Sequence, residues 1–171
     1  MIYGLLPLLR GWMYVYKEPE GLLYYGQEKV LDVVEAPGWL LFFSGRVSDN
    51  LDGKYVRLVL EIDGPEKAYT IEASAYELKE HGVVMPTNYS PYLTVYDDTN
   101  KVYAGCINPS IPMPFSRRFT LKAIPPNTPI EEMVIKPIKY RAAYALVKIT
   151  DVEEFKKSLQ ELLWVETKRI R

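Results

Sequence analysis

Cysteine and histidine are almost absent from this chain of 171 residues, which contains only Cys106 and His81 of these two types. One cysteine cannot form a disulfide within the chain, and it excludes a zinc site built on several cysteines. A Ser-His-Asp arrangement would have to use His81, which stands before Gly82 where a short helix is predicted to end. That place favours an interaction of the histidine with the helix dipole. We therefore predict a non-enzymatic protein without catalytic residues.

Long apolar runs and an excess of positive charge are also missing. No run of about 18 apolar residues occurs, so no membrane span is predicted. The net charge is −1, whereas a non-specific nucleic-acid binder needs a basic surface, so no nucleic-acid partner is expected. Residues 1–16 are apolar, but Pro7 and Arg10 interrupt them, and they lack a basic start and a small-residue cleavage site. No signal peptide is recognised, and an intact, unprocessed chain is expected.

Motifs for nucleotide binding or hydrolysis are missing as well, because no GxSxG, P-loop or GxGxxG pattern occurs. Two acidic loops are weak candidates for a cation site: Asp49 and Asp52 lie in the first, and Asp97 and Asp98 in the second. The spacing is not that of an EF-hand, and an Asx-turn and a hairpin turn explain the loops more simply. No pair of facing glycosidase carboxylates can be recognised. We expect no metal and no cofactor.

The sequence does contain many short alternating segments separated by turn residues. The clearest is Lys54–Ile62, where Val56, Leu58, Leu60 and Ile62 are predicted to face inward and Tyr55, Arg57, Val59 and Glu61 outward. Further strands are predicted over residues 12–16, 22–25, 28–36, 39–47, 68–73, 92–96, 101–107, 117–124, 133–140 and 143–149. In 28–36, Val30, Asp32 and Val34 are expected on one face. This spacing of strands predicts a sandwich or a barrel.

Two segments have helical signals. Ser74 and Glu77 form a capping-box pattern before Gly82, which predicts a helix of about two turns. At the end of the chain, Val152, Phe155, Leu159, Leu162 and Leu163 fall on one helical stripe and predict an amphipathic helix over residues 151–164. The expected organisation is an apolar N-terminal arm (1–16), a β-sandwich (17–149) and a C-terminal helix (150–171) that packs on the sandwich or extends from it.

Three short motifs carry a resemblance to known folds. They are Ile62-Asp63-Gly64, the helical segment 74–82, and Pro112-Met113-Pro114-Phe115. With these motifs, the stretch Gly38–Tyr144 resembles the jelly-roll half-domain of glycoside hydrolase family 172. Residues 37–40 and 60–64 are also similar to small jelly-roll modules in virion proteins of tailed phages and archaeal viruses.

The resemblance implies a mainly-β fold, a single jelly-roll β-sandwich in which residues 112–115 link the two sheets and Phe115 enters the core. The hydrolase family uses two fused jelly rolls and acidic residues from several loops. This chain has room for one jelly roll, so the activity is not carried over.

The chain contains fourteen tyrosines. Each tyrosine has an apolar ring and a hydroxyl that can remain hydrated, so this content indicates a contact surface. The interface candidates are Leu5, Leu8, Leu9, Trp12, Tyr14, Tyr24, Tyr25, Tyr89 and Tyr92. Residues 1–16 are too apolar for a free tail, so they either add a strand to their own sheet or dock on a neighbouring subunit.

We expect a structural subunit of a virion or similar extracellular assembly, as a capsid, vertex or tail component. Its expected partners are copies of itself and other structural subunits. The alternatives are a carbohydrate-binding module for a surface glycan and a minimal glycosidase related to family 172.

Overall fold

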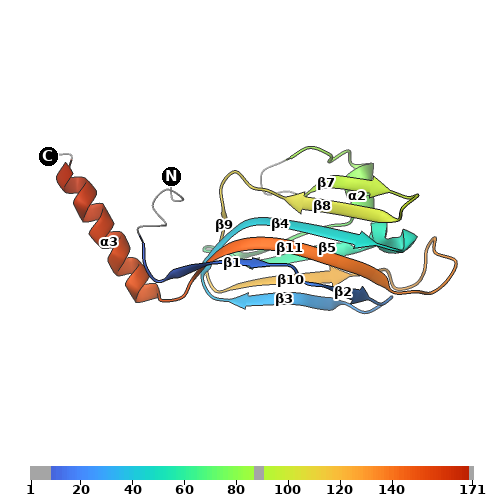
Figure 1. The fold of residues 1–171 in the computed structure, drawn as a ribbon, viewed down its shortest axis with the longest axis horizontal. Helices are drawn as coiled ribbons and strands as arrows, with labels where there is room; N and C mark the ends of the chain where they lie inside the picture. The colour runs from blue at the N-terminus through green and yellow to red at the C-terminus, as the bar shows by residue number, and fades with distance from the viewer. Residues whose placement is uncertain (1–8, 87–90, 170–171) are drawn as a thin grey trace.

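The computed structural model describes residues 9–86 and 91–169, with residues 163–169 described by backbone alone. They form a mainly-β sandwich of two antiparallel sheets (Figure 1). The seven-stranded sheet has the order β1 (Trp12–Lys17), β11 (Ile138–Ile149), β4 (Gly38–Ser48), β8 (Val102–Ile107) and β7 (Tyr92–Asp97), with β2 (Glu20–Leu23) also paired to β11 and β9 (Met113–Phe115) to β4. The four-stranded sheet has the order β3 (Lys29–Glu35), β10 (Arg118–Ile124), β5 (Arg57–Asp63) and β6 (Ala68–Ala73). The predicted β-sandwich is confirmed.

The core lies between the inner faces of the two sheets. Leu40, Tyr144 and Leu146 enter it from the seven-stranded sheet, and Leu60 and Phe119 enter it from the other. The rings of Phe119 and Tyr144 meet across the sandwich with centroids 5.4 Å apart. Period-two alternation thus places one face of each strand in a shared apolar layer.

Strand β5 follows the predicted alternation on its inner face, where Leu60 and Ile62 are buried and Leu58 is partly buried. It begins at Arg57 and not at Lys54, because Leu51–Tyr55 form a 3₁₀ helix. Val59 was predicted to face outward, and it is buried on that outer face. Its cross-strand neighbours are Glu72 and Lys122, and the aliphatic stems of such side chains cover apolar surface.

Strand β3 departs from the strict alternation predicted for residues 28–36. A bulge shifts the register, so that Leu121 pairs with Asp32 but Lys122 pairs with Val30. Leu31 therefore packs against the core, whereas Val30 is exposed. The predicted grouping of Val30 with Asp32 and Val34 is wrong, because the extra residue of a bulge reverses the faces beyond it.

The crossover before β10 has the predicted geometry. Strand β9 pairs with β4 of the seven-stranded sheet, and the chain then enters β10 of the four-stranded sheet. Phe115 is 2% exposed and its ring lies against that of Phe119. It also fills the space above Gly38, where an added Cβ would lie 2.8 Å from the Phe115 ring and 2.1 Å from the Val147 carbonyl oxygen.

Two predicted strands, 133–140 and 143–149, are in fact one strand, β11. Residues 133–137 lie outside it, in the loop that follows β10. Pro137 has no N–H for a sheet ladder, which is consistent with the strand beginning directly after it.

The two helices lie in the predicted segments, although the C-terminal helix continues to Arg169, beyond its predicted end at residue 164. In α2 (Ala75–Glu80), the Ser74 hydroxyl accepts the Glu77 N–H at 3.2 Å and the Glu77 carboxylate accepts the Ser74 N–H at 2.8 Å. Helix α3 (Val152–Arg169) is capped by Asp151, which accepts the Glu154 N–H at 2.9 Å. Figure 1 shows α3 projecting from the end of the sandwich at which β1 begins. No helix in the described residues has the length and apolarity to span a membrane.

Candidate functional site

The outer face of the seven-stranded sheet carries aromatic side chains on neighbouring strands. Tyr16 of β1 and Phe42 of β4 both lie opposite Ala145 of the intervening β11. Because Ala145 is small, the two rings meet above it with centroids 6.2 Å apart. Tyr14, two residues before Tyr16, lies on the same face of β1. We call Tyr14, Tyr16 and Phe42 the aromatic face.

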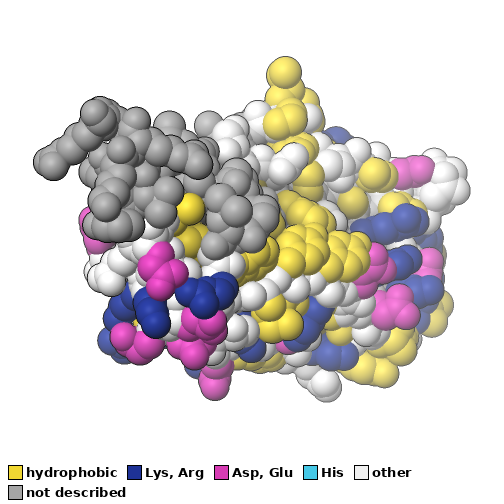
Figure 2. Space-filling model, turned by 60° about the vertical axis from the view of Figure 1, so that its left-hand side comes forward, with side chains coloured by type: hydrophobic (Ala, Val, Ile, Leu, Met, Phe, Trp, Pro, Cys, Tyr) yellow, Lys and Arg dark blue, Asp and Glu magenta, His cyan; other side chains and the backbone are white. Residues whose placement is uncertain are grey.

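The aromatic face is open to solvent along β1. Tyr14 is 55% exposed and Tyr16 is 49% exposed, well above the usual exposure of side chains in a packed core. Figure 2 shows hydrophobic side chains in a band across this view of the molecule, with charged side chains on both sides of it. Contiguous apolar patches bordered by polar residues mark interaction sites on soluble proteins.

A charged group borders the aromatic face. The Tyr16 hydroxyl donates to Glu18, and this bond raises the pKa of Tyr16. Arg141 also donates to Glu18, at 2.5 Å. The hydrogen bonds from Tyr16 and Arg141 lower the pKa of Glu18. The tyrosine is therefore a neutral phenol and the glutamate an anion near neutral pH.

At the end of the sheet near α3, the outer face is covered by the chain itself. Leu9 and Val147 are buried in a cluster with Trp39, Leu41, Phe155 and Leu159, which brings the first turns of α3 onto the sheet. The Trp39 and Phe155 rings have centroids 6.0 Å apart. The outer face of the seven-stranded sheet is thus covered by α3 at one end, and the exposed aromatic face continues the same surface.

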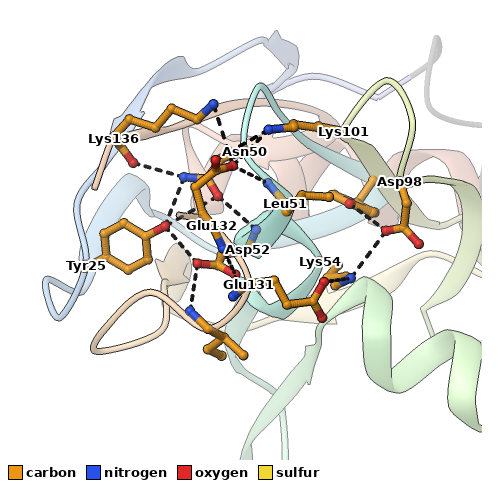
Figure 3. A network of polar contacts seen from close by, with 12 residues as sticks. Tyr25, Asn50, Leu51, Asp52, Lys54, Asp98, Lys101, Glu131, Glu132 and Lys136 are labelled. Atoms are coloured by element: carbon orange, nitrogen blue, oxygen red, sulfur yellow. Dashed lines mark hydrogen bonds and ion pairs between the residues drawn. The ribbon is translucent and has the colours of Figure 1, made fainter. Parts of the chain in front are cut away.

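The opposite end of the sandwich contains a polar network centred on Asp52 (Figure 3). Asp52 is fully buried, and its carboxylate accepts hydrogen bonds from the Tyr25 hydroxyl at 2.9 Å and from the backbone N–H groups of Ile130 (2.9 Å), Glu131 (2.7 Å) and Glu132 (3.3 Å). Burial raises the pKa of Tyr25 to about 12, so this phenol remains a donor. Asp52 thereby fixes the loop between β10 and β11 to the 3₁₀ helix.

Lys54 is the cation of the same network. Its ammonium lies 2.6 Å from Glu131 and 3.4 Å from Asp98. Burial opposes the charge of Lys54, but the hydrogen bond with Glu131 and the nearby acidic groups raise its pKa overall. Asp98 also accepts the buried Tyr103 hydroxyl at 2.8 Å, which is the main cause of its lowered pKa. Charge-assisted bonds of this kind are stronger than neutral ones.

Glu132 completes the network. It accepts the Leu51 N–H at 3.2 Å and pairs with Lys101 at 3.0 Å and Lys136 at 3.6 Å. Beyond it, the loop carries three exposed apolar side chains: Met133, Val134 and Ile135. Figure 1 shows this loop at the end of the sandwich away from α3. The network therefore holds an apolar loop in a defined place, and its acidic groups are already occupied by protein donors.

The four acidic candidates do not form one site. Asp52 and Asp98 belong to the polar network. Asp97 accepts the Asn100 N–H at 2.9 Å within the hairpin turn between β7 and β8, and Asp49 is an exposed turn residue with a φ of 69°. Within the described ranges, no group of three or more His, Cys, Asp or Glu side chains is placed to hold a metal ion.

The interface candidates fall into different environments. Tyr14 and Tyr24 are exposed, Trp12 and Tyr92 are half-buried, Leu9 is buried below α3, and Tyr25 belongs to the polar network. Leu5, Leu8 and Tyr89 lie outside the described residues. Tyr16 and Phe42 were not among the candidates, although the alternation of β1 placed Tyr16 on the same face as Tyr14.

Sequence reasoning also missed Lys54, Glu131 and Glu132 as parts of one network. Lys54 was assigned to a strand, and the loop acids lie about 80 positions away along the chain, so no local pattern connects them. The one local signal was the charged pair Glu131 and Glu132 after Pro129, which stands directly before the strand predicted over residues 133–140. A scan against protein-family models and a search of curated proteins found no match to this chain.

Proposed function

We propose that this protein is a non-enzymatic structural subunit that self-associates within a virion or similar surface assembly, and that its sandwich is a single jelly roll. The pairing of the strands supports the jelly roll. Strand β1 pairs with β11, β3 with β10, β4 with β8 and β5 with β6, so the pairs are nested along the chain. A jelly roll is a long antiparallel hairpin wound into two sheets, and it produces nested pairs of this kind.

The exposed aromatic face is the observation that carries the self-association. Tyr14, Tyr16 and Phe42 form apolar surface on a sheet whose other end is already covered by α3. Tyrosine and phenylalanine are enriched in protein interfaces, where they supply buried area with little loss of conformational entropy. Placed between two subunits, this surface would be removed from water.

The test is the molar mass of the purified protein as a function of concentration, measured by light scattering after size exclusion. We expect a mass that rises above the 19.8 kDa of one chain. Tyr16→Lys introduces a charge on the aromatic face and should shift the protein toward the monomer. The matched control is Val30→Lys, at an exposed apolar position of the four-stranded sheet, which should leave the mass unchanged. A wild-type protein that stays at the monomer mass at high micromolar concentration contradicts the proposal.

The exposure of Tyr14 and Tyr24 also favours a second candidate, a module that binds a surface glycan through tyrosine rings. A glycan array with the wild type and the Tyr16→Lys variant, which we expect to be monomeric, distinguishes the two. Glycan binding by a monomeric protein would favour the module, and oligomers without glycan binding favour the structural subunit.

A further inference from the structure

We propose that the outer edge of β1 pairs with β1 of a second copy of this chain, in an antiparallel arrangement about a two-fold axis at Tyr14. This proposal rests on the self-association proposed above and names the surface that carries it. The result is a dimer in which the two seven-stranded sheets join into one continuous sheet.

The direction of the backbone groups of β1 follows from its pairing with β11. The Thr150 N–H donates to the Gly11 carbonyl and the Ala142 N–H donates to the Pro19 carbonyl, both at 2.8 Å. In an antiparallel ladder, residues alternate between bonding to one neighbour and pointing away from it. The odd positions therefore face β11, and the N–H and C=O groups of Tyr14 and Tyr16 point to the outer edge. In the described part of the chain, β11 is the strand paired with β1.

Two of the other edges of the sandwich, β3 and β7, have features that natural sheets use against edge-to-edge pairing. Strand β3 has an inward-pointing charge, Asp32, which accepts the Tyr144 hydroxyl at 2.5 Å. Strand β7 has a bulge between Leu93 and Val95, and its Leu93 N–H donates to the Val83 carbonyl at 2.8 Å.

Within the described residues, strand β1 has neither an inward-pointing charge nor a bulge in its pairing with β11. Its sequence, WMYVYK, contains no proline and has its only charge at the last position. Met13, Tyr14 and Tyr16 are exposed, so at Tyr14 and Tyr16 the edge combines outward-pointing backbone groups with apolar side chains. Such an edge favours pairing with another strand.

A second copy of β1 fits this edge in a self-complementary register. A two-fold axis at Tyr14 places Tyr14 opposite Tyr14 of the second copy and Met13 opposite its Val15. Lys17 then lies opposite Gly11 of the second copy, so the lysines of the two strands do not face each other. Aromatic and β-branched cross-strand pairs stabilise antiparallel sheets, whereas like charges directly opposite destabilise them.

The test compares Tyr14→Pro with Tyr14→Ala in the full chain. Both remove the tyrosine ring, but only proline removes the N–H that points to the outer edge, and neither change breaks a bond to β11. By analytical ultracentrifugation, we expect the dimer of Tyr14→Pro to dissociate at about tenfold to a hundredfold higher concentration than that of Tyr14→Ala. Equal dissociation constants for the two variants would overturn the pairing.

Cross-linking gives a second measurement that does not depend on a proline. Directly opposed residues of an antiparallel pair have Cα atoms about 4.5–5.5 Å apart, within the range that a disulfide spans. In a Cys106→Ser background, Tyr14→Cys should oxidise to a covalent dimer, and Val30→Cys on the other sheet should not. Equal rates for both would overturn the register. A monomeric wild type contradicts the proposed function itself, whereas an oligomer unaffected by Tyr14→Pro relative to Tyr14→Ala contradicts only this pairing.

Discussion

At the scale of single residues, the fold depends strongly on Asp52, a buried carboxylate with four protein donors. Asp52→Asn keeps the shape but replaces one acceptor oxygen with an amide donor that faces N–H or O–H donors. Leaving buried donors unpaired costs about 1–3 kcal/mol, and more where a charge is involved. We therefore predict a loss of about 2–3 kcal/mol in the free energy of unfolding, measured by urea denaturation.

Asp49→Asn is the matched control, because Asp49 is exposed and has a positive φ that asparagine tolerates. It should change the free energy of unfolding by less than about 0.5 kcal/mol. If Asp52→Asn were equally neutral, the clamping of the loop by Asp52 would not contribute to stability. The sequence identified the acidic loop of Asp49 and Asp52 as a turn but did not reveal that Asp52 is buried, because its donors are Tyr25 and residues 130–132, all distant along the chain.

At the scale of elements, the crossover from β9 to β10 joins the two sheets through Phe115. Phe115→Ala removes a ring that contacts Phe119 and fills the space above Gly38. We predict a loss of about 3–5 kcal/mol, because the rigid surroundings cannot collapse into the cavity. Ile111→Ala, at an exposed position just before β9, is the control and should be nearly neutral in the same denaturation experiment. A cost below about 1 kcal/mol for Phe115→Ala would mean that the crossover relaxes around the cavity.

The sequence predicted most elements because their signals are local. The alternation of β5, the capping box at Ser74 and the apolar stripe of α3 depend on neighbouring residues only. The errors have non-local causes. The bulge in β3 arises from its pairing with β10, and the 3₁₀ helix at Leu51–Tyr55 is held by the polar network. Residues 133–137 follow Glu131 and Glu132, which bond to Asp52 and Lys101, and the Lys136 carbonyl accepts a hydrogen bond from Asn50. The candidate surface was predicted in part, through Tyr14, because tyrosine content indicates contact without specifying the face.

At the scale of the whole molecule, the two ends of the sandwich are stabilised differently. The end near α3 is held by apolar packing around Leu9 and Val147. The other end is held by the ion pairs of Lys54 and Glu132. Apolar burial does not change with protonation, whereas ion pairs do, so acid should weaken the end that carries the polar network first.

The pH dependence of stability should therefore reveal the polar network. The hydrogen bond from Lys54 is the main cause of the lowered pKa of Glu131, and that from Tyr103 is the main cause for Asp98. Because their folded pKa values lie below the unfolded ones, the unfolded state binds more protons as the pH falls. The stabilisation is complete above the ordinary carboxyl pKa range of about 4–4.5 and is lost as the pH falls through the lowered folded values.

Lys54→Met tests this assignment, because it keeps a side chain of similar length and removes the cation. In urea denaturation at a series of pH values from 7 to 3, the variant should be less stable than the wild type at neutral pH. The difference should shrink at acid pH, where the protonated carboxyls no longer attract Lys54. Lys139→Met, at an exposed position of β11, should follow the wild-type curve throughout. A difference between Lys54→Met and the wild type that stays constant across this pH range would show that Lys54 stabilises the fold through packing and not through its ion pairs.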